Sequence, residues 1–297
     1  MNRITRSEDD MMALIVKTAV SDERIRAVIL NGSRTNPSAK KDFLQDYDIV
    51  YVVGETESFI NDPGWIDCFG ERLILQTPQT MSIPDPSTDN YFSYLMLFTD
   101  GNRIDLTLIP IEKFAKIAQQ DSQSICLLDK DGILPALPPA SEKDYHIQSP
   151  TQKQFSDCCN EFWWVSIYVA KGLWREETVY ACYMLNGPVR NMLIQMIAWQ
   201  IGIRTNFSVS IGNEGKYLKD HMDPILWQEL LDTYPYAKNE EIWEALFAMI
   251  KLFRKLAIDV SKQQRFYYDS KEDENINRYL SEIYELPKGT GGVTPNR

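Results

Sequence analysis

Histidine is scarce in this sequence, and paired-cysteine motifs are missing. The 297 residues include two histidines, His146 and His221, for both of which we expect a structural or surface role. A histidine-rich zinc site or a serine–histidine–aspartate triad is therefore hard to assemble. The five cysteines show no Cys-x-x-Cys spacing, so we expect reduced thiols and a cytoplasmic location. If the chain carries out chemistry, carboxylates must supply it.

Positive charge is also in short supply. The chain has 31 lysines and arginines against 42 aspartates and glutamates, which gives a formal net charge of −11. A nucleic-acid groove needs basic side chains to neutralise phosphates, so we expect no nucleic-acid partner. The acidity suits a cationic small substrate, although it also suits any soluble protein. No apolar run approaches membrane-spanning length, and the N-terminal MNRITRSEDD lacks an apolar signal core, so we expect no membrane association.

Strand-like and helix-like patterns alternate over the first part of the chain. Ser7 followed by three acidic residues predicts the start of a helix. The Asp100-Gly101 pair predicts a tight turn between two antiparallel strands. The remaining pattern predicts a helix over 55–69 that is interrupted near 63–64, a helix over 111–119, and strands over 25–30, 48–53, 72–76, 91–98, 103–109 and 125–128.

Helical periodicity dominates after residue 149. Ser149, Pro150 and Gln152 predict a helix with Ser149 as its N-cap. The Gly187-Pro188 pair predicts a kink or a break inside the second helix. The helices that we expect cover 151–174, 176–201, 214–233, 239–263 and, as a weaker pattern, 275–285.

Three prolines between residues 133 and 148 indicate a domain boundary. The predicted fold class is α+β. An N-terminal α/β domain with a mixed sheet covers residues 1–135, a helical bundle covers 149–285, and a disordered tail covers 286–297.

The segment LNGSRTNPSAKKDFLQDYDIVYVV, residues 30–53, carries the strongest chemical signal. Asp46 and Asp48 are two residues apart at the start of a strand, so their carboxylates face the same way. Two such carboxylates repel each other unless a cation lies between them or one is protonated, and Mg²⁺ suits them. Gly32 lets a phosphate approach the backbone, where the Ser33 hydroxyl and nearby amides can bind it. The segment predicts a metal and triphosphate site; the alternative is a surface loop before an acidic strand.

A third carboxylate comes from the strand predicted over 103–109. Arg103, Asp105 and Thr107 alternate there with apolar residues, so Asp105 stands on one face of an otherwise core-forming strand. An aspartate in this position is often exposed to solvent. Here it would supply the third acidic ligand that Asp46 and Asp48 lack.

The first helix of the C-terminal part carries a mixed stripe of side chains. Its members recur at steps of three and four, which places them on one face: Glu161, Trp164, Tyr168, Lys171 and Arg175. One acid, two aromatic rings and two bases suit the wall of a cleft, with Lys171 or Arg175 facing a triphosphate and Glu161 a cation. The alternative is a solvated helix face.

Lys216 is a second basic candidate for phosphate binding. It follows Gly212 and Gly215 and stands close to a predicted helix start, where backbone amides favour anions. A solvated lysine on a loop is the alternative.

These motifs together resemble a known family. Gly32-Ser33, Asp46-x-Asp48 and Asp105 resemble the signature of the polymerase-β-like nucleotidyltransferases. The longer strings NGSRTNP, QDYDIVYVV, DGNRIDLTLIP, NEFWWVSIYVAKGLWREE and EGKYLK resemble the aminoglycoside 6-adenylyltransferases over nearly the whole chain except the tail. That family transfers AMP from ATP to a hydroxyl of streptomycin, with Mg²⁺, and confers antibiotic resistance.

The resemblance implies a role for each motif. Asp46, Asp48 and Asp105 become the catalytic and metal-binding carboxylates, and Gly32 and Ser33 hold the phosphates. Lys171 and Lys216 become further nucleotide contacts, and Glu161, Trp164 and Tyr168 become contacts to the aminoglycoside. Two alternatives remain: transfer to another acceptor, such as a different antibiotic or a protein hydroxyl, and a non-catalytic nucleotide-binding or antitoxin-like module. The three intact carboxylates count against the second. The oligomeric state does not follow from the sequence.

Overall fold

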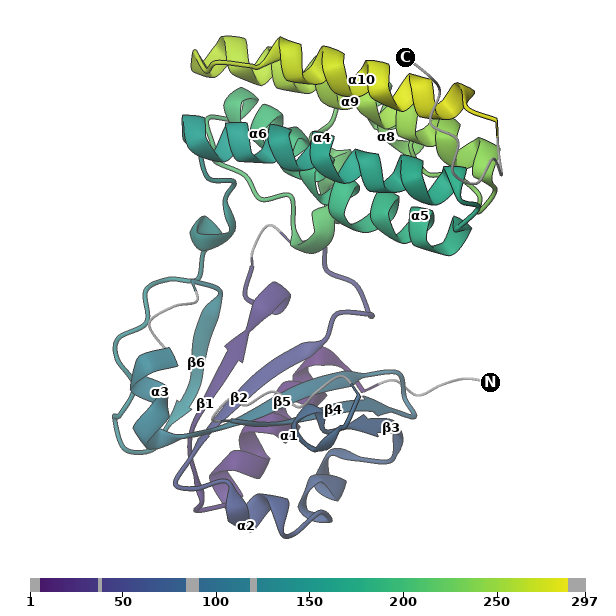
Figure 1. The fold of residues 1–297 in the computed structure, drawn as a ribbon. Helices are drawn as coiled ribbons and strands as arrows, with labels where there is room; N and C mark the ends of the chain where they lie inside the picture. The colour runs from purple at the N-terminus through teal and green to yellow at the C-terminus, as the bar shows by residue number, and fades with distance from the viewer. Residues whose placement is uncertain (1–5, 37–38, 84–90, 118–121, 288–297) are drawn as a thin grey trace. The chain divides into compact units, whose positions relative to one another are not determined.

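The computed structural model describes residues 6–36, 39–83, 91–117 and 122–287 of the chain. It divides the protein into two compact units, Met1–Asp144 and Tyr145–Arg297, which are drawn together in Figure 1. Of the tail predicted to be disordered, residues 288–297 lie outside the described part. Each unit has its own hydrophobic core.

Six strands in the described part of the first unit form one mixed sheet, in the order β3-β4-β5-β2-β1-β6. Strands β2 and β5 are parallel, and every other neighbouring pair is antiparallel. This sheet and the helical second unit confirm the α+β class. The strands are β1 Ile25–Asn31, β2 Tyr47–Val53, β3 Arg72–Gln76, β4 Phe92–Phe98, β5 Arg103–Pro110 and β6 Ser124–Asp129.

The two faces of this sheet are covered differently. Helix α1, Glu8–Ser21, packs Met11 and Ile15 onto one face, within the larger core of the unit. Helix α3, Ile111–Ile117, covers part of the other face, where Phe114 packs with Val50 and Val52. A capping box between Ser7 and Asp10 starts α1, as the sequence predicts.

The helix predicted over 55–69 is two short pieces, helix α2 Glu57–Ile60 and the 3₁₀ turn η2 Trp65–Phe69. The break at 63–64 is confirmed. Two further 3₁₀ turns, η3 Pro78–Thr80 and η4 Lys143–Tyr145, lie in the connecting segments.

Helices make up the second unit, and aromatic rings form the centre of its core. Phe162 on α4 stacks on Phe253 on α9 with 3.7 Å between ring centroids, and Trp163 meets Phe253 edge to face. The helices are α4 Gln152–Trp174, α5 Thr178–Met184, α6 Arg190–Arg204, α7 Leu218–His221, α8 Pro224–Leu231, α9 Asn239–Gln264 and α10 Ser270–Glu285. A π-helical turn, η5 Leu185–Val189, joins α5 to α6 at the predicted Gly187-Pro188 break.

Two predictions for this unit are wrong. The N-cap of α4 is Thr151 rather than Ser149, because Thr151 and Gln154 form a complete capping box. The single helix predicted over 214–233 is interrupted: a 3₁₀ turn, η6 Asn213–Gly215, precedes α7, and Asp223 caps a new helix at Pro224. Proline at the first position starts a helix but would break one that ran through it.

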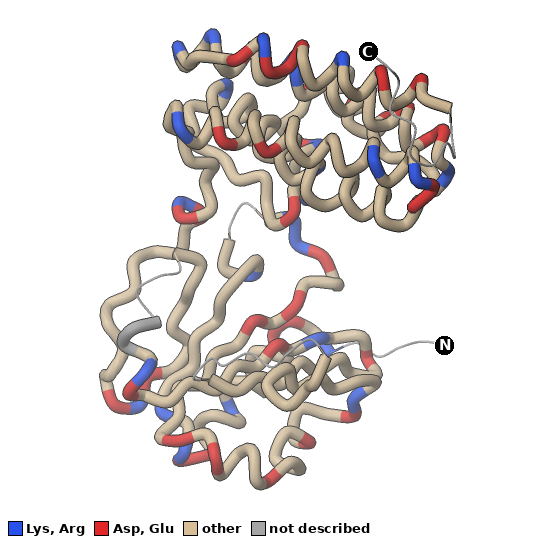
Figure 2. The backbone as a smooth tube through the Cα atoms, viewed as in Figure 1, with Lys and Arg blue, Asp and Glu red and all other residues tan. Residues whose placement is uncertain are grey.

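The described residues of the two units show no basic stripe (Figure 2). In both units the basic positions are scattered among acidic ones along the described backbone (Figure 2). None of the helices in the described residues is long and apolar enough to span a membrane.

Candidate active site

Three carboxylates meet on the α3 side of the sheet, where β2 and β5 run in parallel. Asp48 on β2 is in register with Asp105 on β5, and Asp46 immediately precedes β2. Side chains two residues apart share a face of a strand, so Val50 and Val52, buried on the α3 side, continue the same row. The apolar part of the row therefore determines where the acidic part points.

Gly32 makes room for one of these carboxylates. It follows β1 with a φ of +73°, and a Cβ atom there would lie 2.2 Å from Oδ2 of Asp48. Only glycine combines this backbone conformation with so close an approach. The turn η1, Gly32–Arg34, then places the Ser33 hydroxyl beside the loop, where it accepts a hydrogen bond from Gln45 Nε2 at 3.4 Å. The structure thus brings the Gly-Ser pair and the acidic strand start together.

Arg103 supplies the positive charge at this cluster. Its Nε donates to Asp105 Oδ1 at 2.8 Å, and its Nη2 donates to Asp105 Oδ2 at 2.7 Å. Its Nη1 lies 3.4 Å from Asp46 Oδ2. The hydrogen-bonded Asp105, together with the charges of Asp46 and Asp48, raises the pKa of Arg103. Arg103 is thus the countercharge of all three acids.

The surroundings of Asp46 change the pKa of its carboxyl group. Burial raises the pKa of Asp46; the charge of Arg103 opposes this rise, and the Asp105 carboxylate adds to it. A like charge and partial loss of water both disfavour the ionised form. Asp46 in its ionised form therefore gains from any additional cation at the site.

The donor chemistry of the cluster suits a divalent cation. Within the described ranges, no group of three histidine, cysteine, aspartate or glutamate side chains is arranged as a finished metal site. Carboxylate oxygens are nevertheless the protein ligands that Mg²⁺ prefers, and a cationic group already lies against Asp46 and Asp105. The residues present fit a metal ion in charge and in ligand type.

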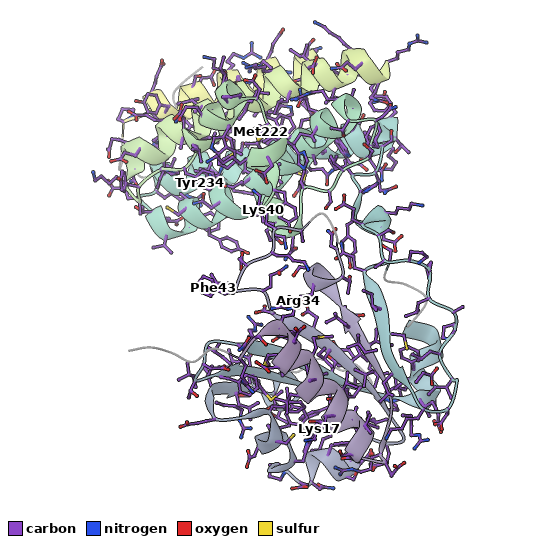
Figure 3. The ribbon with its side chains drawn as sticks, turned by 180° about the vertical axis from the view of Figure 1, so that it is seen from behind. Lys17, Arg34, Lys40, Phe43, Met222 and Tyr234 are labelled. Carbon is purple, nitrogen blue, oxygen red and sulfur yellow. The ribbon has the colours of Figure 1, made fainter. Side chains whose placement is uncertain are left out.

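Arg34 anchors the backbone that carries Asp46. Its Nε donates to the carbonyl oxygen of Asp46 at 2.9 Å, and its Nη2 donates to that of Gln45 at 2.7 Å. The guanidinium lies 3.7 Å from the centre of the Tyr47 ring, and its side chain is only 7% exposed. Arg34, labelled in Figure 3, therefore ties the Gly-Ser turn to the acidic strand start.

We expect Arg34→Met to lower stability by about 1–3 kcal/mol, because two carbonyl oxygens lose their donor. It should also lower kcat, since the Asp46 peptide is no longer fixed. Arg34→Lys, which keeps the charge but not the forked donor, should recover only part of both losses. Thermal unfolding and initial rates measure these effects; an unchanged kcat in folded Arg34→Met would show that Arg34 does not position Asp46.

The stripe predicted on α4 lies on one side of that helix in the second unit. Glu161 and Trp164 are exposed, and Tyr168 and Lys171 are partly buried. The Trp164 indole donates to the Tyr168 hydroxyl at 2.9 Å, and Lys171 Nζ lies 5.7 Å from the Tyr168 ring centre. Tyr168 therefore contacts both Trp164 and Lys171.

Glu161 lies apart from these contacts, at a hollow of about 620 Å³ within the second unit. Asp157, one helical turn earlier, and the buried Trp199 of α6 also line this hollow. We call it the acidic hollow. Two carboxylates beside an aromatic wall suit a cationic ligand.

Lys216 is exposed on the segment between η6 and α7, with Nζ 5.0 Å from the Tyr217 ring centre. The predicted helix start is displaced: α7 begins at Leu218 and is a single turn. Lys216 is therefore placed by an irregular loop and not by a long helix.

Sequence reasoning gave no role to two arginines. Strand periodicity places Arg103 and Asp105 on one face of β5, but it does not show that Arg103 binds Asp105 and approaches Asp46. Arg34 directly follows the Gly-Ser pair, but no local pattern shows that its guanidinium reaches the backbone of residues 45 and 46.

Comparison with known proteins gives consistent matches along the chain. Residues 5–283 match the family model of streptomycin adenylyltransferase. The chain is 42% identical to an aminoglycoside 6-adenylyltransferase of Bacillus subtilis, over 94% of this chain and 98% of that protein. It is also 42% identical to one of Campylobacter jejuni, over 93% and 95%. A crystal structure of an aminoglycoside 6-adenyltransferase from Bacillus subtilis, 40% identical, covers 95% of this chain and 100% of that one, with a TM-score of 0.48.

The chain is accordingly an enzyme of the nucleotidyltransferase class. It belongs to the streptomycin adenylyltransferase family.

Proposed function

We propose that this enzyme transfers AMP from ATP to a hydroxyl group of streptomycin and so confers resistance to it. The register of Asp48 with Asp105, with Asp46 beside them and the Gly32–Ser33 turn in contact, carries the proposal. The names of the relatives support an aminoglycoside acceptor, and the family name supports streptomycin. All five cysteines are free, which supports a reducing, cytoplasmic location.

The reaction is an in-line attack of the acceptor oxygen on the α-phosphorus, with pyrophosphate as the leaving group. Asp46, Asp48 and Asp105 are the residues that would hold Mg²⁺. When bound, the ion neutralises phosphate charge and lowers the pKa of the acceptor hydroxyl. Asp105 either contributes only as a ligand or accepts the proton of that hydroxyl. The Gly32 backbone and the Ser33 hydroxyl bind phosphate oxygens.

The second unit contributes to substrate binding in this proposal. Glu161 binds a guanidinium group of streptidine through charge-assisted hydrogen bonds. Trp164 and Tyr168 offer ring faces to the same cation, and Lys171 and Lys216 contact nucleotide phosphates. The acidic hollow at Glu161 and Asp157 supports the cation-binding role of Glu161.

An assay with radiolabelled ATP and a panel of acceptors tests the proposed function. Label should move to streptomycin, with release of pyrophosphate and dependence on Mg²⁺. Transfer to kanamycin or lincomycin but not to streptomycin would keep the nucleotidyltransferase class and overturn the substrate. Absence of transfer to every acceptor would favour a non-catalytic nucleotide-binding protein.

Glu161→Gln should raise the KM for streptomycin at least tenfold and leave the KM for ATP within about twofold. A hydrogen bond to a charged group contributes about 1.5–3 kcal/mol, which the neutral amide largely loses. Glu244→Gln is a matched control, because Glu244 is an exposed acid on α9. Unchanged streptomycin kinetics in Glu161→Gln would identify Glu161 as a solvated helix residue.

A further inference from the structure

Arg190, at the start of α6, is buried without an acidic partner. It is 5% exposed, and its guanidinium donates to Asn186 Oδ1 at 2.9 Å, to Thr233 Oγ1 at 2.6 Å and to the Thr233 carbonyl at 2.8 Å. All of these acceptors are neutral. Its carbon Cζ lies 3.5 Å from the centre of the Tyr234 ring, and Tyr234 is labelled in Figure 3.

A cation in this position is costly unless a negative charge reaches it. Burial lowers the pKa of Arg190, and no carboxylate of the described residues offsets that effect. Arg254 in the same unit is better solvated, with 37% of its side chain exposed, and still pairs with the buried carboxylate of Asp273. Arg190 has neutral hydrogen-bond partners and an aromatic face, which leave its charge uncompensated.

This charge lies at a hollow of about 770 Å³ within the second unit, which we call the Arg190 hollow. Its polar lining includes Asn186, Asn191 and Gln195, and Tyr234 provides an aromatic wall. Glu214 also lines it, but makes no ion pair with Arg190. The hollow is thus wide enough for a small polar ligand.

Irregular backbone forms two walls of the Arg190 hollow. Asn186 belongs to the π-helical turn η5. Such turns are rare in proteins overall, but many of them occur at functional sites. On the facing loop, Gly212, Glu214 and Gly215 all have positive φ, at 71°, 50° and 76°. For Glu214 this conformation is strained, and such strain is typical of ligand-binding segments.

The Arg190 hollow adjoins the acidic hollow. Gln195, Ala198 and Ile211 line both. One side of this shared wall faces a buried cation, and the other faces Asp157 and Glu161. A transferase with an anionic nucleotide and a cationic acceptor needs two such environments.

We propose that the Arg190 hollow is an anion site of its own within the second unit, distinct from the Gly32–Ser33 turn. It binds a polyphosphate, either free pyrophosphate or the triphosphate end of an ATP molecule, with Arg190 as its countercharge. This assignment rests on the proposed adenylyl transfer for the identity of the anion. The guanidinium attracts phosphate oxygens at the buried end of the hollow, and the amides of Asn191 and Gln195 offer further donors.

Calorimetry on the full-length Asp48→Asn protein in EDTA tests this without turnover or metal. Pyrophosphate, ATP and adenosine are titrated separately. We expect pyrophosphate to bind, and Arg190→Met in the same background to weaken it at least tenfold. If Arg190→Met weakens ATP binding equally, the triphosphate end of ATP is a ligand of the hollow. If it weakens only pyrophosphate binding, the ligand is the released product. Binding of adenosine but not pyrophosphate, or no effect of Arg190→Met, overturns the proposal.

Further variants distinguish a structural role of Arg190 from a role of its charge in anion binding. Thr233→Val removes a hydrogen-bond acceptor of Arg190 but leaves its charge, so anion binding should stay within about threefold. Gln195 is exposed and outside the Arg190 hydrogen bonds. Gln195→Glu should therefore weaken pyrophosphate binding about threefold or more and Gln195→Lys should strengthen it, by charge alone. Gln263→Glu, on exposed α9 surface that does not line the hollow, should do neither.

The Gln195 pair keeps the proposal testable if Arg190→Met fails to fold. If Gln195→Glu and Gln195→Lys do not change pyrophosphate binding in opposite directions, the proposal is overturned. These outcomes are separate from the acceptor assay: if wild-type enzyme adenylylates no aminoglycoside while pyrophosphate binding still depends on Arg190, the function fails and the anion site stands.

Discussion

Asp48→Asn and Asp46→Asn should each lower kcat by about a thousandfold or more while the protein stays folded. Each substitution removes a negative charge and nearly nothing in volume. The apolar residues that hold this end of β2, such as Val50 and Val52, keep their contacts. Each substitution removes the negative charge that faces Arg103 and any cation bound with the nucleotide. Electrostatic stabilisation of this kind is commonly the largest single contribution to catalysis.

The expected stability of Asp46→Asn separates this effect from unfolding. Burial holds the pKa of Asp46 in the folded protein above its ordinary value, so the folded state binds its proton more tightly than the unfolded state. The free energy of unfolding therefore falls as the pH rises from the ordinary pKa of an aspartate through the higher pKa of Asp46 in the folded protein. At neutral pH, ionised Asp46 lowers the stability of the folded state. Replacing it by neutral asparagine should leave the thermal midpoint unchanged or slightly higher at pH 7.

Initial rates at saturating Mg²⁺, with thermal unfolding of the same preparations, provide the measurement. Asp9→Asn, in the exposed first turn of α1, is a matched charge control and should retain wild-type kcat. Near wild-type turnover of folded Asp46→Asn or Asp48→Asn would refute the metal-binding role.

The acidic face was predictable because strand periodicity is local. Asp46, Asp48 and the apolar residues after them specify one face of β2 by spacing alone. Their distance to Asp105 was not predictable, since it depends on the parallel pairing of β2 with β5 across about fifty residues. The side-chain reach of Arg103 and Arg34 depends on the same pairing and on the loop that returns at residue 45.

The errors in the helical unit have local causes. Ser149-Pro150 and Thr151-x-x-Gln154 both indicate helix starts. The helix begins after Thr151 because the side chains of Thr151 and Gln154 each accept a hydrogen bond from the other's backbone N–H. The pattern over 214–233 is apolar enough for one helix, but Gly215 with a φ of +76° and Pro224 interrupt it. The sequence pattern did not predict the burial of Arg190, because that burial follows from how α6 packs near Thr233 and not from the neighbours of Arg190 in sequence.

Gly32→Ala should lower kcat at least a hundredfold and cost about 1–2 kcal/mol of stability. The stability cost arises because an L-residue at a φ of +73° is strained. The loss of activity arises because the new Cβ would lie 2.2 Å from Asp48 Oδ2, far inside contact distance, so the carboxylate or the turn must move. Either movement separates the phosphate-binding backbone from the acidic face.

Gly54→Ala is the matched control for this experiment. Gly54 directly follows β2, and a Cβ atom there meets nothing within 4 Å. It should change neither kcat nor the thermal midpoint by much, since removing glycine at an unstrained position has only a small effect. The decisive comparison is kcat at saturating Mg²⁺ and ATP for the two alanine variants, after both are shown to be folded. If Gly32→Ala matches Gly54→Ala in turnover, the turn tolerates a side chain, and the close approach of Gly32 to Asp48 is not needed for adenylyl transfer.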